Sequence, residues 1–212
     1  MKICVIGGGS SGLTSIKACK EENVDVECFE LSDNFGGLWR YHDDTEDGRP
    51  SVMKNTVINT SKEMSAFSDF PPPKEFANYM HNIYMLEYFR MYAQHFDLLK
   101  HIRYKCKVTK VEMVEDYEKT GRWSVTVQDL DKDVTFTNIY DGVMVCAGHH
   151  TYPHYASFEG LEHFQGTVKH THTLKTNKGY EDRKVLVIGI GNSGVDAAVE
   201  LCRVAKKVCF VL

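Results

Sequence analysis

Two glycine-rich turns in this chain have the spacing that lets a backbone hold a dinucleotide. The first turn reads G-x-G-x-x-G and consists of Gly7, Gly8, Gly9, Ser10, Ser11 and Gly12. In such a turn the first glycine permits a tight bend, the second allows close approach of a pyrophosphate, and the third allows close packing of helix on strand. The N–H groups and the dipole at the start of that helix would face the phosphates.

An acidic residue stands where a ribose would be recognised. The apolar run 3–6 predicts a buried strand before the turn, Ser10 to about Glu22 predicts a helix after it, and 24–29 predicts a second strand. Glu30 ends this second strand, where a carboxylate accepts hydrogen bonds from ribose hydroxyls. Because the strand, the helix and the acid are all present, we interpret the turn as a dinucleotide site rather than a purely structural glycine turn.

The same pattern recurs near the end of the sequence. The second turn and the helix start behind it contain Gly189, Gly191, Asn192, Ser193, Gly194 and Asp196. A buried strand is predicted over 184–188, a helix over 196–205 and a further strand over 207–212. The two copies are much further apart than the repeats of a solenoid, so they predict two separate dinucleotide sites.

Two segments between the turns could lie against a cofactor. Adjacent glycines and two bulky apolar residues stand together at Gly36, Gly37, Leu38 and Trp39. They fit either a loop that covers a cofactor ring or a tight turn with Trp39 in the core. Asn59, taken alone, fits an ordinary turn or a helix N-cap.

The supporting elements begin with a helix. The proline-rich stretch 67–73 predicts a rigid loop. Apolar residues then recur at three- and four-residue steps, which predicts a helix over 74–99 with an interruption near His81 and Asn82. Its aromatic residues are expected in the core rather than in a substrate pocket.

Short strands follow the helix. β-branched and aromatic runs over 102–114, 123–128 and 134–139 alternate with turn residues and indicate a small antiparallel meander. The apolar run 143–146 predicts one more buried strand, which would return to a parallel sheet.

Histidines are concentrated in the irregular stretch 148–177. If 168–173 is extended, His170 and His172 share one face. No cysteine or carboxylate stands at convincing ligand spacing beside them, so we predict no metal site.

Composition excludes several classes of protein. The chain is 42% hydrophobic and 25% charged, which is ordinary for a globular protein with a sizeable core. A net charge of -4 without a basic stripe argues against nucleic acid as a partner. The seven scattered cysteines form no C-x-x-C pair and indicate free thiols in a reducing compartment. We expect neither a cleavable signal nor a membrane-spanning run.

Two dinucleotide sites imply electron transfer between two cofactors. A first site at the extreme N-terminus suggests FAD, and a later one suggests a nicotinamide donor. Disulfide reductases need a redox cysteine pair, which this sequence lacks, and simple flavin oxidases need no second site. Flavin monooxygenases need both sites.

With these motifs the sequence resembles the flavin-containing monooxygenases over essentially its whole length. The matching stretches are 7–12, Glu30, 36–40, 59–64, 68–71, 86–88, 95–101, 143–146 and 189–194. The most specific match is F-x-G-x-x-x-H, formed by Phe164, Gly166 and His170 just before the second turn.

The resemblance implies an α/β fold. A Rossmann-type parallel sheet would bind FAD, a small antiparallel β-meander would be inserted in it, and a second, NADP-binding Rossmann-type domain would begin near the end. We expect a domain over 1–150, a linker over 151–183 and the truncated start of the NADP-binding domain over 184–212. The resemblance implies that Asn59 is the active-site asparagine and that Thr60 and the 37–39 loop help to hold cofactor.

The resemblance also implies a reaction. FAD and NADPH would serve oxygenation by O₂ of a soft nucleophilic nitrogen or sulfur in a small amine or sulfide, through a flavin hydroperoxide kept in a dry pocket. The family location is the cytosolic face of the endoplasmic reticulum membrane; a chain of only this length would be cytoplasmic. The alternatives are Baeyer–Villiger oxygenation of ketones, or a truncated, catalytically incompetent FAD-binding fragment.

Three features depart from the family pattern. Leu174 replaces an aromatic residue four positions after the fingerprint histidine, and Leu31 replaces a basic residue after Glu30. Family members also continue well past Leu212. The residue that reads the ribose 2′ position would lie at or beyond Leu212, so NADP is preferred over NAD by resemblance alone.

Overall fold

The computed structural model describes residues 1–46 and 48–211. They form two compact units, Met1–Arg40 with Met85–His149 and Tyr41–Tyr84 with His150–Leu212. The domain boundaries expected from the sequence remain a prediction.

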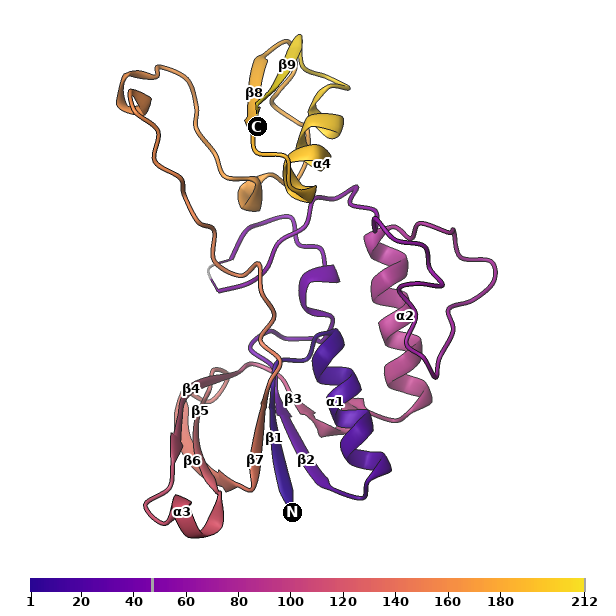
Figure 1. Ribbon diagram of the computed structural model, residues 1–212, viewed down its shortest axis with the longest axis vertical. Helices are drawn as coiled ribbons and strands as arrows, with labels where there is room; N and C mark the ends of the chain where they lie inside the picture. Colours follow the sequence, from indigo (N-terminus) through magenta and orange to yellow (C-terminus); the bar gives the residue numbers. More distant parts are fainter. Residues whose placement is uncertain (47, 212) are drawn as a thin grey trace. The chain divides into compact units, whose positions relative to one another are not determined.

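The first unit is built on a four-stranded parallel sheet (Figure 1). Its strands are β1 (Lys2–Ile6), β2 (Asp25–Phe29), β3 (Ile102–Arg103) and β7 (Gly142–Val145), in the order β3-β2-β1-β7. All three pairings are parallel, and β1 lies between β2 and β7. Cys4 and Val5 are fully buried because both faces of β1 are covered. The predicted return of the 143–146 strand to the parallel sheet is confirmed.

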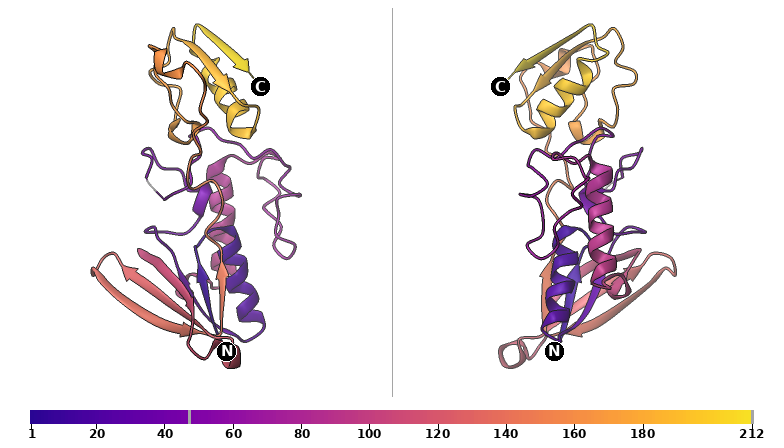
Figure 2. Two further views of the ribbon diagram at one scale, coloured as in Figure 1. Left: turned by 60° about the vertical axis from the view of Figure 1, so that its left-hand side comes forward. Right: turned by 90° about the vertical axis from the view of Figure 1, so that its right-hand side faces the viewer.

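Two layers cover this sheet. Helix α1 (Ser10–Glu21) packs on one face, and Leu13 and Ile16 are its buried residues as predicted, whereas Ala18 is exposed. The antiparallel sheet lies on the other side, as the left view in Figure 2 shows. It joins β1 and β2 through a shared core that includes Cys4, Phe29 and Tyr140.

The predicted meander is present with changed boundaries. Its strands are β4 (Cys106–Met113), β5 (Trp123–Asp129) and β6 (Val134–Tyr140), with the short helix α3 (Tyr117–Thr120) between the first two. The single strand predicted over 102–114 is wrong. Lys105 has a positive φ of 53° and turns the chain between β3, which pairs with β2, and β4, which pairs with β5.

The predicted helix over 74–99 is also too long. Helix α2 covers Asn82–His95, and a 3₁₀ turn, η2, covers Leu99–His101. The main-chain oxygens of Lys74 and Phe76 accept hydrogen bonds from Lys62 Nζ rather than from a following helical turn, and the Pro73 oxygen is shared between Lys62 Nζ and the Phe76 N–H. That competition, after three consecutive prolines, prevents a helix there. The expectation that the helix aromatics are core holds for Tyr88, Phe89 and Tyr92, whereas Phe96 is half-buried and Tyr84 is exposed.

The second unit contains a two-stranded parallel sheet and the helix α4. Strands β8 (Lys184–Ile188) and β9 (Lys207–Val211) flank α4 (Asn192–Leu201), and the 3₁₀ turns η3 (Leu161–His163) and η4 (Thr171–Thr173) precede them. Helix α4 begins and ends four residues before the predicted 196–205. It packs through Ala197 and Leu201 on Met53 and Leu174.

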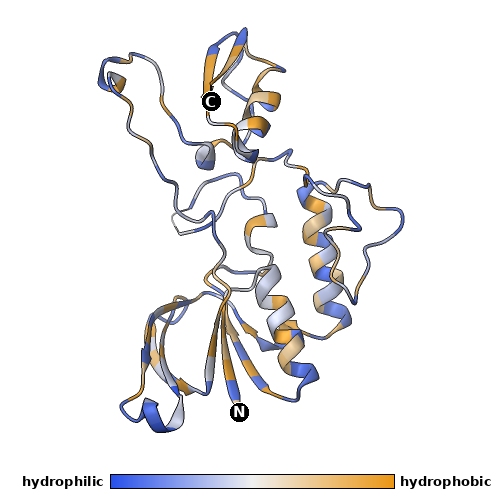
Figure 3. Ribbon diagram, in the orientation of Figure 1, coloured by the Kyte–Doolittle hydropathy of each residue, from blue (hydrophilic) through white to orange (hydrophobic). Residues whose placement is uncertain are grey.

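The predicted burial of β8 is wrong. Figure 3 shows hydrophobic residues along β8 and β9, yet Leu186 and Ile188 are 57% and 50% exposed. Strand β7, predicted to be buried, also exposes Met144 and Val145. An apolar run predicts a strand that can be buried. Whether the strand is buried depends on neighbouring elements that lie elsewhere in the sequence.

Candidate functional site

The first glycine turn is held by contacts that no side chain could tolerate. Gly7 has a φ of +102°, and a Cβ there would lie 2.5 Å from the main-chain oxygen of Cys146. A Cβ on Gly12 would lie 1.9 Å from the oxygen of Gly7. Both glycines are therefore required for the bend and for the packing of α1 against β1.

The start of α1 presents unused N–H groups. Gly9 is the N-cap and receives no side-chain cap, and the helix begins with Ser10 and Ser11. The first N–H groups of a helix have no partner within it, and the dipole adds a partial positive charge. This turn fits an anion such as a pyrophosphate.

Glu30 follows β2 and is fixed from both sides. Its Oε2 accepts the Gly8 N–H at 2.6 Å, and its Oε1 accepts the Ser32 N–H at 2.8 Å and the Ser32 hydroxyl at 2.6 Å. Oε2 keeps one lone pair, which can accept a ribose hydroxyl. Ser32 is buried, and sequence reasoning missed it; a polar residue two positions after the acid was the only signal.

Neighbouring acidic groups stay neutral around Glu30. Burial raises the pKa of the Cys28 thiol, and the Glu30 charge raises it further. Burial likewise raises the pKa of Tyr104 to about 12. The Cys28 thiol and the Tyr104 hydroxyl are therefore uncharged near neutral pH.

The second glycine pair lies against the first turn. The Gly36 N–H donates to the Gly8 oxygen at 3.0 Å, and a Cβ on Gly37 would lie 3.2 Å from the Gly9 Cα. Leu38 and Trp39, in the 3₁₀ turn η1 (Gly37–Trp39), are half-buried. This placement favours a loop that covers a cofactor over an isolated core turn.

Asn59 and Thr60 belong to the second unit, in a bend with both side chains exposed. Asn59 follows Ile58, whose N–H donates to the Met80 oxygen at 2.9 Å. The Thr60 and Ser65 hydroxyl oxygens lie 2.6 Å apart. The backbone of Asn59 is thus in a bend, as its interpretation as a turn residue predicts, and its side-chain amide is exposed.

The second glycine turn repeats the first at atomic detail. Gly189 has a φ of +104°, and a Cβ on Gly194 would lie 2.2 Å from the Gly189 oxygen. Gly191 is the N-cap of α4, so Asn192 and Ser193 open the helix. Asp196 follows in the next turn of α4, and burial raises the pKa of its carboxyl.

Two of the F-x-G-x-x-x-H residues, Phe164 and Gly166, lie close together, and the third, His170, is the N-cap of η4. A Cβ on Gly166 would lie 2.4 Å from the Phe164 ring, but that ring is exposed and can turn away. The condition that 168–173 be extended is not met, because Thr171–Thr173 form the 3₁₀ turn η4. His170 Nδ1 accepts the His172 N–H at 3.0 Å and caps η4, so the two histidines lie on a turn. Nowhere in 1–46 and 48–211 do three metal-ligating side chains gather.

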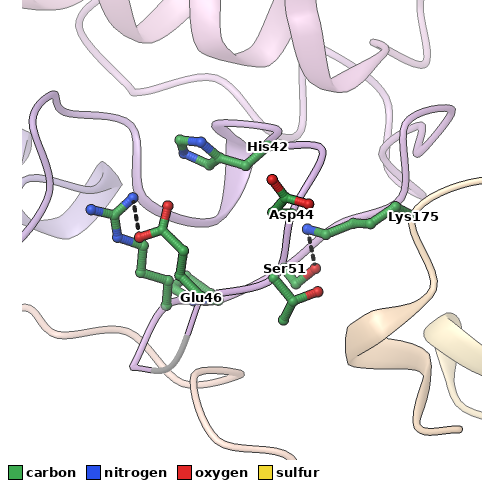
Figure 4. A pocket seen from close by; sticks show the side chains of 8 residues that line it. His42, Asp44, Glu46, Ser51 and Lys175 are labelled. Atoms are coloured by element: carbon green, nitrogen blue, oxygen red, sulfur yellow. Dashed lines mark hydrogen bonds and ion pairs between the residues drawn. The ribbon is translucent and has the colours of Figure 1, made fainter.

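Figure 4 shows a surface pocket that takes no part in these arrangements. Lys175 Nζ donates to Ser51 Oγ at 2.6 Å, and Arg49 pairs with Glu46 at 2.8 Å. Burial lowers the pKa of Lys175, against the opposing effect of nearby carboxylates. None of the predicted cofactor residues lines this pocket.

Two strand–turn–helix cradles of this kind define a dinucleotide-binding protein of the Rossmann type. A family model described as flavin-binding monooxygenase-like matches residues 1–211. The chain belongs to this flavin-binding monooxygenase-like family.

Curated relatives agree with the family model. Human flavin-containing monooxygenase 5 is 50% identical over 209 residues, which cover 98% of this chain and 39% of that protein. Human flavin-containing monooxygenase 2 is 46% identical over the same shares. The chain thus spans 39% of the length of these relatives.

Solved structures share the fold. S-allyl-L-cysteine S-oxygenase from Allium sativum has a TM-score of 0.89 at 26% identity, over 99% of this chain and 50% of that one. Tmm from Pelagibacter has a TM-score of 0.87 at 22% identity over the same shares. NADP+-bound cyclohexanone monooxygenase from Rhodococcus has a TM-score of 0.71 at 24% identity, over 100% of this chain and 38% of that one. The last two likenesses concern the fold alone.

Proposed function

We propose that this chain is part of an FAD- and NADPH-dependent monooxygenase that oxygenates soft nucleophilic nitrogen or sulfur in small molecules. Family membership supports the oxygenase chemistry. A relative 46% identical is named an N-oxide-forming dimethylaniline monooxygenase, and the Allium sativum neighbour is an S-oxygenase. These names favour heteroatom oxygenation over Baeyer–Villiger insertion.

The observation that carries the proposal is the first cradle. The α1 N-terminus would hold the pyrophosphate of FAD, Glu30 would accept a ribose hydroxyl, and the Gly36–Gly37 backbone would cover the cofactor. Bound FAD would supply the oxygen-transferring chemistry once NADPH has reduced it.

The second cradle would receive the nicotinamide cofactor. The N-terminus of α4 would face its pyrophosphate in the same way as α1 faces that of FAD. Asn59 would offer an amide to the reacting centre; its exposed side chain has both a donor and an acceptor available. With no acid–base group required on substrate, an amide suffices to orient the reactants.

The location at the cytosolic face of the endoplasmic reticulum belongs to the same proposal and derives from the family. No helix in the described part of the chain is long and apolar enough to cross a membrane. Cell fractionation with an antibody against 1–40 tests the location directly.

A product assay separates the candidate reactions. Purified protein is titrated with FAD, then given NADPH with a tertiary amine, a thioether or a cyclic ketone in parallel. We expect N-oxide and sulfoxide and no ester. Ester as the main product would favour Baeyer–Villiger chemistry, and FAD binding without any product would indicate a binding fragment.

A further inference from the structure

Lys62 is buried although it has no carboxylate partner. Its exposed fraction is 7%, and its ammonium donates to the main-chain oxygens of Pro73, Lys74 and Phe76 at 3.3, 2.6 and 2.6 Å. An ammonium has three donors, and these oxygens use all three. No ion pair involves Lys62 within residues 1–46 and 48–211. A buried ammonium without a counter-ion is costly, and here its hydrogen bonds to three main-chain oxygens offset that cost.

The segment before Lys62 carries Asn59. The Ile58 N–H donates to the Met80 oxygen at 2.9 Å, and the Lys62 N–H donates to the Asn78 oxygen at 2.6 Å. Asn59 lies between these two cross-links. Its own side chain bonds to nothing in the described ranges, so the direction of its amide is set by the backbone of 58–62 alone.

The other end of the segment is held by a neutral group. The Asn82 N–H donates to the Thr56 oxygen at 2.9 Å, and Asn82 Nδ2 donates to the Met53 and Lys54 oxygens at 3.0 and 3.1 Å. Asn82 is 1% exposed. Segment 53–62 is therefore clamped at both ends, and the clamp beyond Asn59 is the Lys62 ammonium.

We propose that Lys62 is a positioning residue for the oxygenation reaction. Its ammonium holds 56–62 against 73–82 and so fixes the direction of the Asn59 amide. This inference rests on the proposed function, because it assigns Lys62 an effect that acts through Asn59.

The first test needs no turnover. We compare Lys62→Met, Lys62→Arg and the control Lys74→Met, whose exposed side chain is changed while its carbonyl oxygen remains. In Lys62→Met, hydrogen exchange at the amides of Ile58 and Lys62 should rise about tenfold or more, with exchange in β4–β6 unchanged. The nitrogen-edited NMR signal of the Asn59 side chain should shift or broaden. Lys62→Arg, which keeps the charge, should restore much of both signals.

The second test asks whether Lys62 acts through Asn59. In a double-mutant cycle of Lys62→Met with Asn59→Ala, the product formed per NADPH should fall in each single variant and fall little further in the double variant. A structural role alone predicts independent, additive losses. Lys62→Arg should again recover part of the yield.

Several results would overturn the inference. Unchanged exchange and an unchanged Asn59 signal in Lys62→Met would do so, and so would additive losses in the cycle. If Lys62→Met fails to fold, the test uses Lys62→Arg instead. Hydrogen exchange of its backbone amides in 56–62 is then compared with exchange in β4–β6. If the native protein makes no product, the proposed function fails, whereas exchange and the Asn59 signal still decide whether Lys62 holds the loop.

Discussion

The two glycine turns have the same local geometry and different support. Gly7 and Gly189 have φ values of +102° and +104°, and their N–H groups donate to Phe29 and Val211 at 2.8 and 2.9 Å. Around Gly7, however, the oxygen of Cys146 closes the turn, whereas nothing lies within 4 Å of a Cβ placed on Gly189. The bend is therefore encoded locally, and its rigidity comes from neighbouring strands.

The strands before the two turns differ in the same way. β1 lies between two parallel partners and is fully buried at Cys4 and Val5, whereas β8 pairs with β9 alone and exposes Leu186 and Ile188. Apolar burial is the main source of stability in a sheet. We therefore expect the first cradle to be the stable one and the second to depend on what it contacts.

The largest effect should come from the third glycine of the first turn, and it can be compared with the third glycine of the second turn. Gly12→Ala places a Cβ 1.9 Å from a backbone oxygen inside a buried sheet, and should lower the free energy of unfolding by about 3 kcal/mol or more. Gly194→Ala meets a similar contact at 2.2 Å in an open sheet that can adjust, so about 1 kcal/mol is expected. Urea unfolding followed by circular dichroism measures both. Equal losses would contradict the difference in support.

The next largest effect is expected on FAD affinity when the Glu30 carboxylate, at the end of β2, is removed. Glu30→Gln keeps the shape of the side chain and removes the negative acceptor of the Gly8 N–H and of a ribose hydroxyl. FAD affinity should fall about tenfold to a hundredfold, since bonds to a charged group contribute about 1.5–3 kcal/mol. Flavin fluorescence titration measures the Kd, with the exposed Glu22→Gln as control. An unchanged Kd would remove Glu30 from the site.

A smaller effect is expected from the group that fixes Glu30. Ser32→Ala removes a hydroxyl that donates to Glu30 Oε1 at 2.6 Å but leaves the Ser32 N–H in place. The loss of one such bond should weaken FAD binding about fivefold, near 1 kcal/mol. The same titration checks it, and Ser68→Ala, at an exposed hydroxyl, serves as control. A loss as large as that of Glu30→Gln would mean that Ser32 contacts the cofactor itself.

The smallest effect is a pH dependence of opposite sign in the two units. Burial acts to raise the pKa of Glu27, but bonds from Tyr140, Lys2 and Arg103 outweigh it and leave the pKa below its ordinary 4.5. The stabilisation from Glu27 is thus present above pH 4.5 and is lost as the pH falls through the lowered pKa.

Asp196 in the second unit behaves in the reverse sense. Burial raises the pKa of its carboxyl above the ordinary 3.8, so the folded state binds the proton more tightly than the unfolded state does. The contribution of Asp196 to stability is therefore larger at acid pH and falls as the pH rises through the raised pKa. Hydrogen exchange between pH 3 and 6, about the range in which carboxylates titrate, should show β1 protection falling with acid in a Glu27-dependent way. Glu27→Gln should flatten that slope. Protection in α4 should change with pH in the opposite direction, and Asp196→Asn should flatten that dependence. If protection in β1 and in α4 changed with pH in the same direction, this prediction would be wrong.

Sequence alone predicted the features that are encoded within a few residues. Both glycine turns, the helix after the first and the β4–β6 meander follow from local spacing and turn chemistry, and the family followed from the order of the motifs. The roles of the individual site residues, Asn59 among them, stay predictions.

The errors share one physical cause, which is a partner distant in sequence. The 102–114 run is split because two of its residues pair with β2. The 74–81 stretch is not helical because Lys62 takes its carbonyl oxygens. The exposure of β8 reflects the absence of a second neighbouring strand in the described sheet. Propensity scales contain none of these contacts.

The contact between Gly7 and Cys146 also orders events during synthesis. β1 leaves the ribosome first, yet its second neighbour, β7, and the oxygen that closes the turn are among the last parts of the first unit to emerge. Until then β1 has an unpaired edge that another chain could join. The first turn is therefore complete only after residue 146 has emerged, and the edge of β1 stays open until then.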